Sequence, residues 1–338
     1  MYNSCRNRHC PQCQGAARAK WVRERIKDIL PVAYFHVAFT IPQEFRALAL
    51  RNKKVVYNIL FRAASETLME VAATRLKVTI GVMAILHTWG QELLDHPHLH
   101  FLVTGDGLSL DGTRAVTAVT AWIGGNANYF LPGQILMEVF RAKFLDYLGD
   151  AYEEGKLIFP GKIAQLGERG VLPALLREMK KKLWNVKTKK PFAGPEQVLC
   201  YLGRYTHSVA ISNRRLLSCE NDQVTFAYKD YADGSKEKKM PLSVEEFMRR
   251  FLLHVLPSGF KKMRGYGLLG NRVKKKKLEL CRDLIARQEP SKAAAMIRAP
   301  GLIVTIPERP VCPKCGSEEF QIWKFGPIHG TPIAVDTS

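Results

Sequence analysis

The sequence predicts an α+β fold, in which helices flank a mainly antiparallel sheet and a small cysteine-rich segment precedes it. Residues 81–91 and 96–104 are two apolar runs separated by a short polar turn, which is the pattern of an antiparallel hairpin. Residues 133–155 carry apolar side chains at helical spacing and end in glycine, as amphipathic helices do. The 338 residues are enough to bury a substantial core.

The remaining elements are expected in order along the chain. Residues 15–30 predict a basic amphipathic helix, and residues 35–41 predict an apolar strand that ends before Pro42. Residues 43–75 predict two helices, the second of which begins at Arg62. Later elements are expected at residues 115–123 (a strand), 208–218 and 223–231 (paired strands) and 245–257 (a helix stopped by Pro257).

The cysteine pattern indicates a bound metal instead of disulfides, because some of the cysteines occur in C-x-x-C pairs. Such pairs are half of a four-ligand zinc site. Candidate ligands are Cys5, His9, Cys10 and Cys13 near the N-terminus, and Cys312 and Cys315 near the C-terminus. The second pair could take its partners from the first group or from residues beyond the C-terminus. We expect a structural zinc site, because metal binding supplies folding energy to so short a segment.

These features divide the chain into three regions. Residues 1–30 hold a partial zinc-binding module and the basic helix. Residues 31–242 form the sheet-based core, with an inserted helical and basic region at 113–190. Residues 243–338 form a basic C-terminal region with the second C-x-x-C pair.

The composition indicates a polyanionic partner. The formal net charge is +20, and 46% of the residues are hydrophobic, as in a globular protein. The sequence contains no run of 18 apolar residues, so it predicts no membrane span. No apolar signal core follows the basic N-terminus. We therefore expect a nucleic-acid-binding protein that is not exported and has no membrane partner.

Residues 95–103 predict a strand that presents two histidines on one face. Side chains alternate along a strand, so His98 and His100 point the same way, about 7 Å apart, and Leu99 points into the core. Two such imidazoles can share one cation, and a cation beside a phosphate polarises its oxygen. The hairpin makes Gln91 the candidate third ligand, with Glu92 or His96 as alternatives. A pair of half-buried histidines with only structural hydrogen bonds is the competing interpretation.

A predicted helix that begins at Pro195 carries two tyrosines on one face. Tyr201 and Tyr205 are four residues apart, and Arg204 lies between them. A phenol is a poor nucleophile near neutral pH unless a metal-bound phosphate makes the phosphorus more electrophilic. A core or surface stripe is the alternative for such a tyrosine pair.

Positive side chains near these segments predict contacts with a DNA backbone. An aromatic ring beside cationic groups can stack on bases of a single strand. The candidates are Lys180, Lys181, Lys182, Trp184, Arg204, Arg214 and Arg215. A solvated basic face is the alternative.

Taken together, these stretches resemble the two-tyrosine HUH transposases of the insertion sequence 91 group. The similarity covers most of the chain. It includes YNSCRNRHCPQCQ (2–14), FHVAFTIP (35–42), LHTWGQ (86–91), HPHLHFLV (96–103), PFAGPEQVL (191–199) and YLGRYTHSVAISNRRL (201–216). Family members usually carry a further Cys-rich segment before the equivalent of Tyr2, so we expect this chain to start inside the zinc module.

The resemblance implies an HUH-endonuclease-like fold and a metal-dependent DNA endonuclease and strand transferase. It implies His98 and His100 as ligands of a divalent cation, magnesium or manganese, and Tyr201 and Tyr205 as nucleophiles that form a 5′-phosphotyrosine. Single-stranded DNA at transposon ends and target is the implied partner, and rolling-circle-like transposition in the bacterial cytoplasm, at the nucleoid, is the implied process. No GxxxxGK[ST] motif occurs, so no nucleotide cofactor is expected. A related replication or mobilisation nickase, or a zinc-containing DNA-binding protein without catalysis, is the alternative.

Overall fold

The computed structural model describes Trp21, residues 24–117, 131–189, 198 and 210–288, and two short strands near the C-terminus. The chain forms two compact units, residues 1–300 and 301–338. In the second unit, β10 (Ile322–Lys324) and β11 (Ile333–Val335) pair antiparallel.

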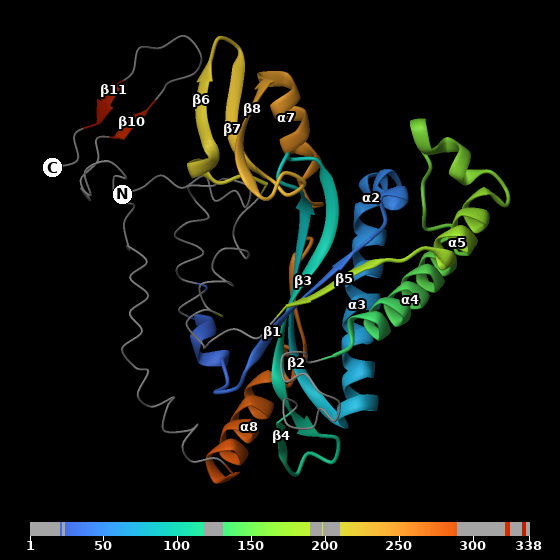
Figure 1. Ribbon diagram of the computed structural model, residues 1–338, viewed down its shortest axis with the longest axis vertical. Coiled ribbons are helices and arrows are strands. Elements are labelled where there is room, and N and C mark those ends of the chain that lie inside the picture. Colours follow the sequence, from blue (N-terminus) through green and yellow to red (C-terminus); the bar gives the residue numbers. More distant parts are fainter. Residues whose placement is uncertain are drawn as a thin grey trace. The chain divides into compact units, whose positions relative to one another are not determined.

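A six-stranded sheet forms the centre of the first unit (Figure 1). Its strand order is β5-β1-β3-β2-β9, and β4 pairs with the far end of β3. Every pairing in this sheet is antiparallel, which confirms the predicted fold class and the predicted hairpin. The strands are β1 (Tyr34–Thr40), β2 (Val78–Trp89), β3 (Asp95–Ser109), β4 (Ala115–Thr117), β5 (Asn185–Lys189) and β9 (Met263–Gly267).

Helices cover one face of this sheet, because alternate strand residues on that face are apolar. Phe39 of β1 and Phe101 of β3 are fully buried and pack edge to face. Phe140 of α4 packs against Phe39, and α3 packs along both the sheet and α4 (Figure 1). The helices of this layer are α2 (Arg46–Arg51), α3 (Lys53–Leu76), α4 (Gly133–Glu153) and α5 (Val171–Lys181).

The boundary between the first two helices differs from the predicted one. We expected the second helix to begin at Arg62, but α3 begins at Lys53 and runs to Leu76. The break falls at Asn52, whose φ of −118° and ψ of 40° are not helical. Its side-chain amide donates to the carbonyl oxygen of Ile158 at 2.8 Å and accepts from the same residue's N–H at 2.8 Å. A buried asparagine that bonds to a distant loop can end a helix without glycine or proline, so the sequence gives little sign of it.

A second, three-stranded sheet packs against the turn between β2 and β3. Leu93 of that turn is buried with Ala210, Ile211 and Phe226. His254 follows α7 and donates from Nε2 to the carbonyl oxygen of Leu93 at 2.9 Å. These contacts fix the turn that joins the two histidine-bearing strands. The elements are β6 (Leu216–Glu220), β7 (Gln223–Asp230), β8 (Lys236–Ser243) and α7 (Val244–Leu253), with α8 (Lys274–Gln288) further on.

Short 3-10 turns connect these elements. They are η1 (Ile26–Asp28), η2 (Gln43–Phe45), η3 (Gly161–Gly167) and η4 (Asn213–Arg215). Within the described ranges, no helix combines the length and the apolar character that crossing a membrane requires.

Candidate functional site

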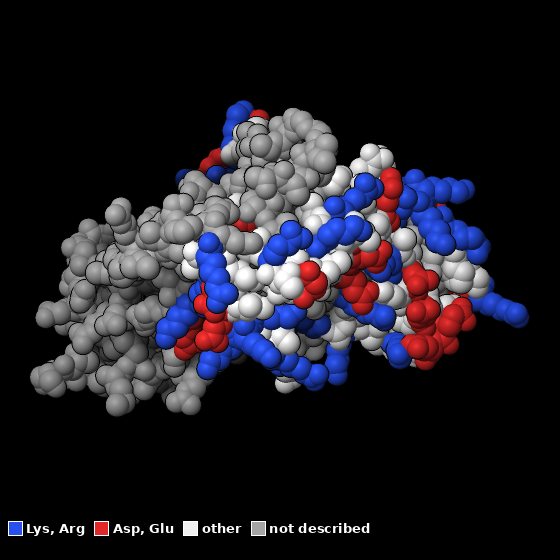
Figure 2. All heavy atoms as spheres, turned by 90° about the horizontal axis from the view of Figure 1, so that it is seen from below, with Lys and Arg blue, Asp and Glu red and all other residues white. Residues whose placement is uncertain are grey.

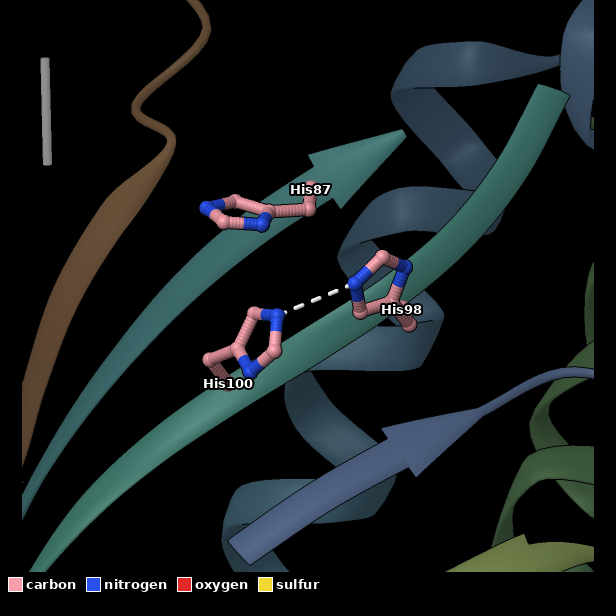
Figure 3. Close-up of side chains that lie close together, drawn as sticks. All are labelled: His87, His98 and His100. Atoms are coloured by element: carbon pink, nitrogen blue, oxygen red, sulfur yellow. Dashed lines mark hydrogen bonds between the residues drawn. The ribbon is translucent and has the colours of Figure 1, made fainter. Parts of the chain in front are cut away.

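Three histidines meet on the sheet face opposite the layer of α3 and α4 (Figure 3). His87 of β2 lies directly opposite His98 of β3 in the strand register, and His100 is two residues further along β3. One ring nitrogen from each histidine lies within 4.8 Å of the other two. Leu86 and Leu99, the neighbouring cross-strand pair, point to the opposite face and are buried in the core. Strand alternation therefore fixes the imidazoles on one side by burying leucines on the other.

Hydrogen bonds orient the rings of His98 and His100. Nδ1 of His98 lies 2.6 Å from the carbonyl oxygen of His96. A carbonyl only accepts, so this Nδ1 carries a proton and Nε2 of the neutral ring has a free lone pair. Nε2 of His98 and Nε2 of His100 are 3.0 Å apart (Figure 3). Both Nε2 atoms therefore point into the cluster.

Burial keeps the imidazoles neutral. It lowers the pKa of His98 to about 4, although the hydrogen bond to His96 opposes the shift. It lowers the pKa of His100 well below its ordinary value, and the positive charge of Lys189 acts in the same direction. Neutral imidazole is the form that binds a metal. Three nitrogen ligands that converge on one point leave open coordination positions, so these residues fit a catalytic divalent cation.

Sequence reasoning missed His87 as a candidate ligand. It placed Gln91 opposite the start of the second strand, but β2 ends at Trp89 and Gln91 lies in the turn. The Gln91 side chain donates to the hydroxyl of Tyr231 at 3.5 Å and accepts from the backbone N–H of Lys229 at 3.4 Å. Gln91 as a ligand stays a prediction, and the described geometry favours His87.

The two alternatives to Gln91 also have other contacts. Arg46 donates to Nδ1 of His96 at 2.9 Å. The backbone oxygen of Glu92 accepts from Arg250 at 3.0 Å. One feature of the sequence could have identified His87. It is a histidine on the strand predicted to pair with the His98 strand, and alternation places it on the same face.

Several predicted site residues lie outside the described residues. They are the nucleophile candidates Tyr201 and Tyr205, Arg204, and the zinc-ligand candidates Cys5, His9, Cys10, Cys13, Cys312 and Cys315. Their roles stay predictions. On either side of the tyrosine segment, Val198 is helical and buried, and Ala210 packs with Leu93 of the β2–β3 turn.

The expectation that Trp184 stacks on DNA bases was wrong. The indole is only 6% exposed and packs against Phe45, Phe140 and Phe144. Its Nε1 donates to the carbonyl oxygen of Met179 at 3.1 Å. The aromatic side chains of η2 and α4 bury the ring in the core, so it is not available to a ligand.

The predicted basic residues fall in different surroundings. Lys180, Lys181 and Lys182 are exposed at the end of α5, and Lys182 pairs with Glu44 and Glu178. That is the helical side of the sheet, opposite the histidines. DNA binding by these lysines stays a prediction.

The two arginines after the tyrosine segment also differ. Arg214 is exposed. Arg215 is half-buried, and its guanidinium donates to the carbonyl oxygens of Ala227, at 2.7 Å, and of Gln91. Burial lowers the pKa of Arg215. Arg215 thus ties the small sheet to the β2–β3 turn, and its DNA contact stays a prediction.

Two other lysines share the face of the histidines. In the register of β1 with its two neighbours, Lys187 and His100 both pair with Ala38. Lys189 pairs with His36 in the next row. Directly paired residues of antiparallel strands project from the same face, so these lysines stand about 10 Å from the histidine strand, two strand spacings away.

The chain is similar to known transposases. Residues 81–277 match the family described as "Putative transposase", with the label Y2_Tnp, and residues 1–41 match a transposase zinc-binding domain of the insertion sequence 91 type. The chain is 46% identical over its full length to "Putative transposase y4qJ" of Sinorhizobium fredii, of which it covers 85%. It is 27% identical over 81% of its length to the transposase for insertion sequence element IS801 of Pseudomonas savastanoi, of which it covers 63%. The chain therefore belongs to the insertion sequence 91 family of transposases.

Proposed function

We propose that this transposase nicks and rejoins single-stranded DNA at the ends of its element through a 5′-phosphotyrosine, in a rolling-circle-like process. The observation that carries the proposal is the convergence of His87, His98 and His100 on one face of the sheet, where burial keeps His98 and His100 neutral. In this proposal the ligand set holds a divalent cation, magnesium or manganese. A cation bound there would polarise the scissile phosphate and stabilise the leaving oxygen.

The nucleophile comes from Tyr201 or Tyr205 in this proposal. The phenolic oxygen attacks phosphorus, the bond from phosphorus to the 3′ oxygen breaks, and the 3′ oxygen takes up a proton. The new phosphodiester keeps the energy of the broken one, so a 3′-hydroxyl can later reverse the step and no nucleotide is consumed. The packing of Ala210 on Leu93 supports the placement, because it brings the chain that leaves the tyrosine segment to the turn between the histidine strands.

Lys187 and Lys189 position the DNA backbone beside the metal centre. Ala38 separates Lys187 from His100 in the register, and its small side chain leaves room above β1. A phosphate chain that crosses β1 would place one phosphate at the histidines and its neighbours near the two ammonium groups. On the face seen in Figure 2, many Lys and Arg side chains lie next to Asp and Glu side chains.

The N-terminal segment holds a structural zinc ion in this proposal. Residues 1–41 match a zinc-binding transposase domain, and Cys5, His9, Cys10 and Cys13 are the candidate ligands there. Removal of zinc would then unfold this segment without removing the cation at the histidine site.

A cleavage assay on a labelled single strand that contains the element end tests the proposal. Wild-type protein should give a nicked product and a covalent protein–DNA band on a denaturing gel only with magnesium or manganese. His87→Ala and His98→Ala should lose both products but keep DNA binding, because Lys and Arg supply most phosphate contacts. Gln91→Ala is the matched control and should keep cleavage. Cleavage by His98→Ala at the wild-type rate would show that the histidines are structural, and loss in Gln91→Ala alone would return the third ligand to Gln91.

A further inference from the structure

A fourth histidine contacts the metal-site cluster from the neighbouring strand. His36 of β1 is only 5% exposed, and its Nε2 lies 2.8 Å from Nδ1 of His100. The two rings are stacked, with centroids 5.0 Å apart and planes at 21°. Sequence reasoning did not single out this residue, because the contact joins positions 64 residues apart.

The sheet register holds His36 in this place. His36 pairs with Leu102, and Ala38 pairs with His100, so His36 and His100 are diagonal neighbours on one face. The flanking residues Phe35 and Val37 are buried in the core on the other face. Any shift of β1 by one residue would remove the imidazole from this face.

The contact uses the nitrogen of His100 that faces away from the cluster. Nε2 of His100 lies beside Nε2 of His98, whereas Nδ1 of His100 faces His36. His98 has the same arrangement, with its Nδ1 bonded to the carbonyl oxygen of His96. Each of the two ligands on β3 therefore has Nε2 directed inward and Nδ1 bonded to an outer partner.

We propose that His36 is a positioning residue for His100, an inference that rests on the proposed metal-dependent function. Without a cation, Nε2 of His98 carries no proton, so its 3.0 Å contact needs the proton on Nε2 of His100, and Nδ1 of His100 then accepts from His36. With a cation bound to the Nε2 atoms, the proton of His100 is on Nδ1, and His36 accepts it at its own Nε2. An outer partner of this kind fixes both the tautomer and the ring orientation of a metal ligand. In this cation-bound form, His36 carries its own proton on Nδ1.

The geometry argues against His36 as a fourth ligand. Among the described residues, the set of nitrogen atoms that lie within 4.8 Å of one another comes from His87, His98 and His100. The Nε2 atom of His36 is already directed at Nδ1 of His100, on the far edge of that ring from the cluster.

Manganese binding to the zinc-loaded full chain tests the proposal without cleavage. Free manganese is counted by electron paramagnetic resonance during a titration, and His98→Ala defines the binding that belongs to the histidine site. His36→Phe keeps a stacked ring but removes the acceptor, and it should weaken manganese binding about 10- to 100-fold, as losing an outer-shell partner does. His36→Gln offers an amide oxygen to the same proton and should recover most of that loss.

Tyr34→Phe is the matched control. Tyr34 lies on the same strand and face, is buried, and accepts a hydrogen bond from the N–H of Leu30 at 2.9 Å. Its loss removes a buried hydrogen bond from β1 without touching a histidine, so manganese affinity should not change. Equal weakening in Tyr34→Phe and His36→Phe would make His36 merely structural, and unchanged affinity in His36→Phe would overturn the inference directly.

Two results keep this inference separate from the proposed function. If His98→Ala binds manganese as the wild type does, the cluster holds no cation, and both proposals fall. If binding depends on His98 but not on His36, only the present inference fails. Long-range ¹H–¹⁵N spectra of wild-type protein give a test that needs no variant. With magnesium bound, we expect the Nδ1–H tautomer for His36 and for His100, and an Nε2–H tautomer of His36 in that form would refute the hydrogen bond as assigned.

Discussion

Replacing Lys187 and Lys189 together by glutamine should reduce the salt dependence of single-stranded DNA binding. Each phosphate that a side chain neutralises adds about 0.7 to the slope of log affinity against log salt for single strands. The register places both ammonium groups on the histidine face, so the double variant should lower the slope by about 1.4. Between 50 and 200 mM salt, this difference corresponds to an about 7-fold smaller fall in affinity than for the wild type.

The assay is fluorescence anisotropy of a labelled single strand at several salt concentrations, without divalent cation. Glutamine keeps much of the lysine stem, so β5 should still pair with β1. The matched comparison is Lys180→Gln with Lys181→Gln, since these exposed lysines lie at the end of α5 on the helical side. A slope that falls only in this second variant would refute the path across β1 and restore the earlier prediction for the α5 lysines.

Three further predictions follow from the site and its supports. Trp184→Ala should destabilise the fold by about 3–5 kcal/mol in urea unfolding, because it leaves a cavity among the core aromatics, and it should leave the salt slope unchanged. Burial lowers the pKa of His254 to about 4, below the ordinary 6.5, so the unfolded chain takes up a proton first as the pH falls and stability is lost between these values. The loss of unfolding free energy from pH 7 to pH 5 should thus be about 2 kcal/mol smaller in His254→Gln than in the wild type. The double variant Tyr201→Phe with Tyr205→Phe should form no covalent adduct on a denaturing gel, and a persisting band would place the nucleophile elsewhere.

The histidine pair on β3 was predictable because strand alternation is local. A polar–apolar–polar run, His98 to His100, fixes which side chains share a face before any partner strand is known. The hairpin was predictable for the same reason, since two apolar runs flank a short polar turn. The α+β class followed from these strands and the amphipathic segment that became α4.

The pairing of His87 with His98 could not be predicted in the same way, because it depends on the geometry of the turn between the two strands. The pairing shifts between His87 and Trp89, so counting back from the turn as if it were regular gives the wrong opposite residue. The prediction that Trp184 contacts DNA was wrong for another reason. Its neighbours in sequence are lysines, which suggested a surface, whereas its neighbours in space are the aromatics of α4 and Phe45. Neighbours in sequence indicate the surroundings of a side chain only where the packing is local.

The relative positions of the histidines depend on the apolar side chains of the opposite sheet face. Leu86 and Leu99 form the cross-strand pair next to His87 and His98, and both leucines are buried beneath the helices. A buried cross-strand pair resists any slip of β2 against β3, since a one-residue slip would turn the leucine of the shifted strand out of the core. The register of β2 and β3 therefore also holds the imidazoles on the opposite face in their relative positions. The same argument extends to β1, where Phe35 and Val37 hold His36 against His100. In this sheet the apolar core thus sets the register, and the register sets the positions of the histidines.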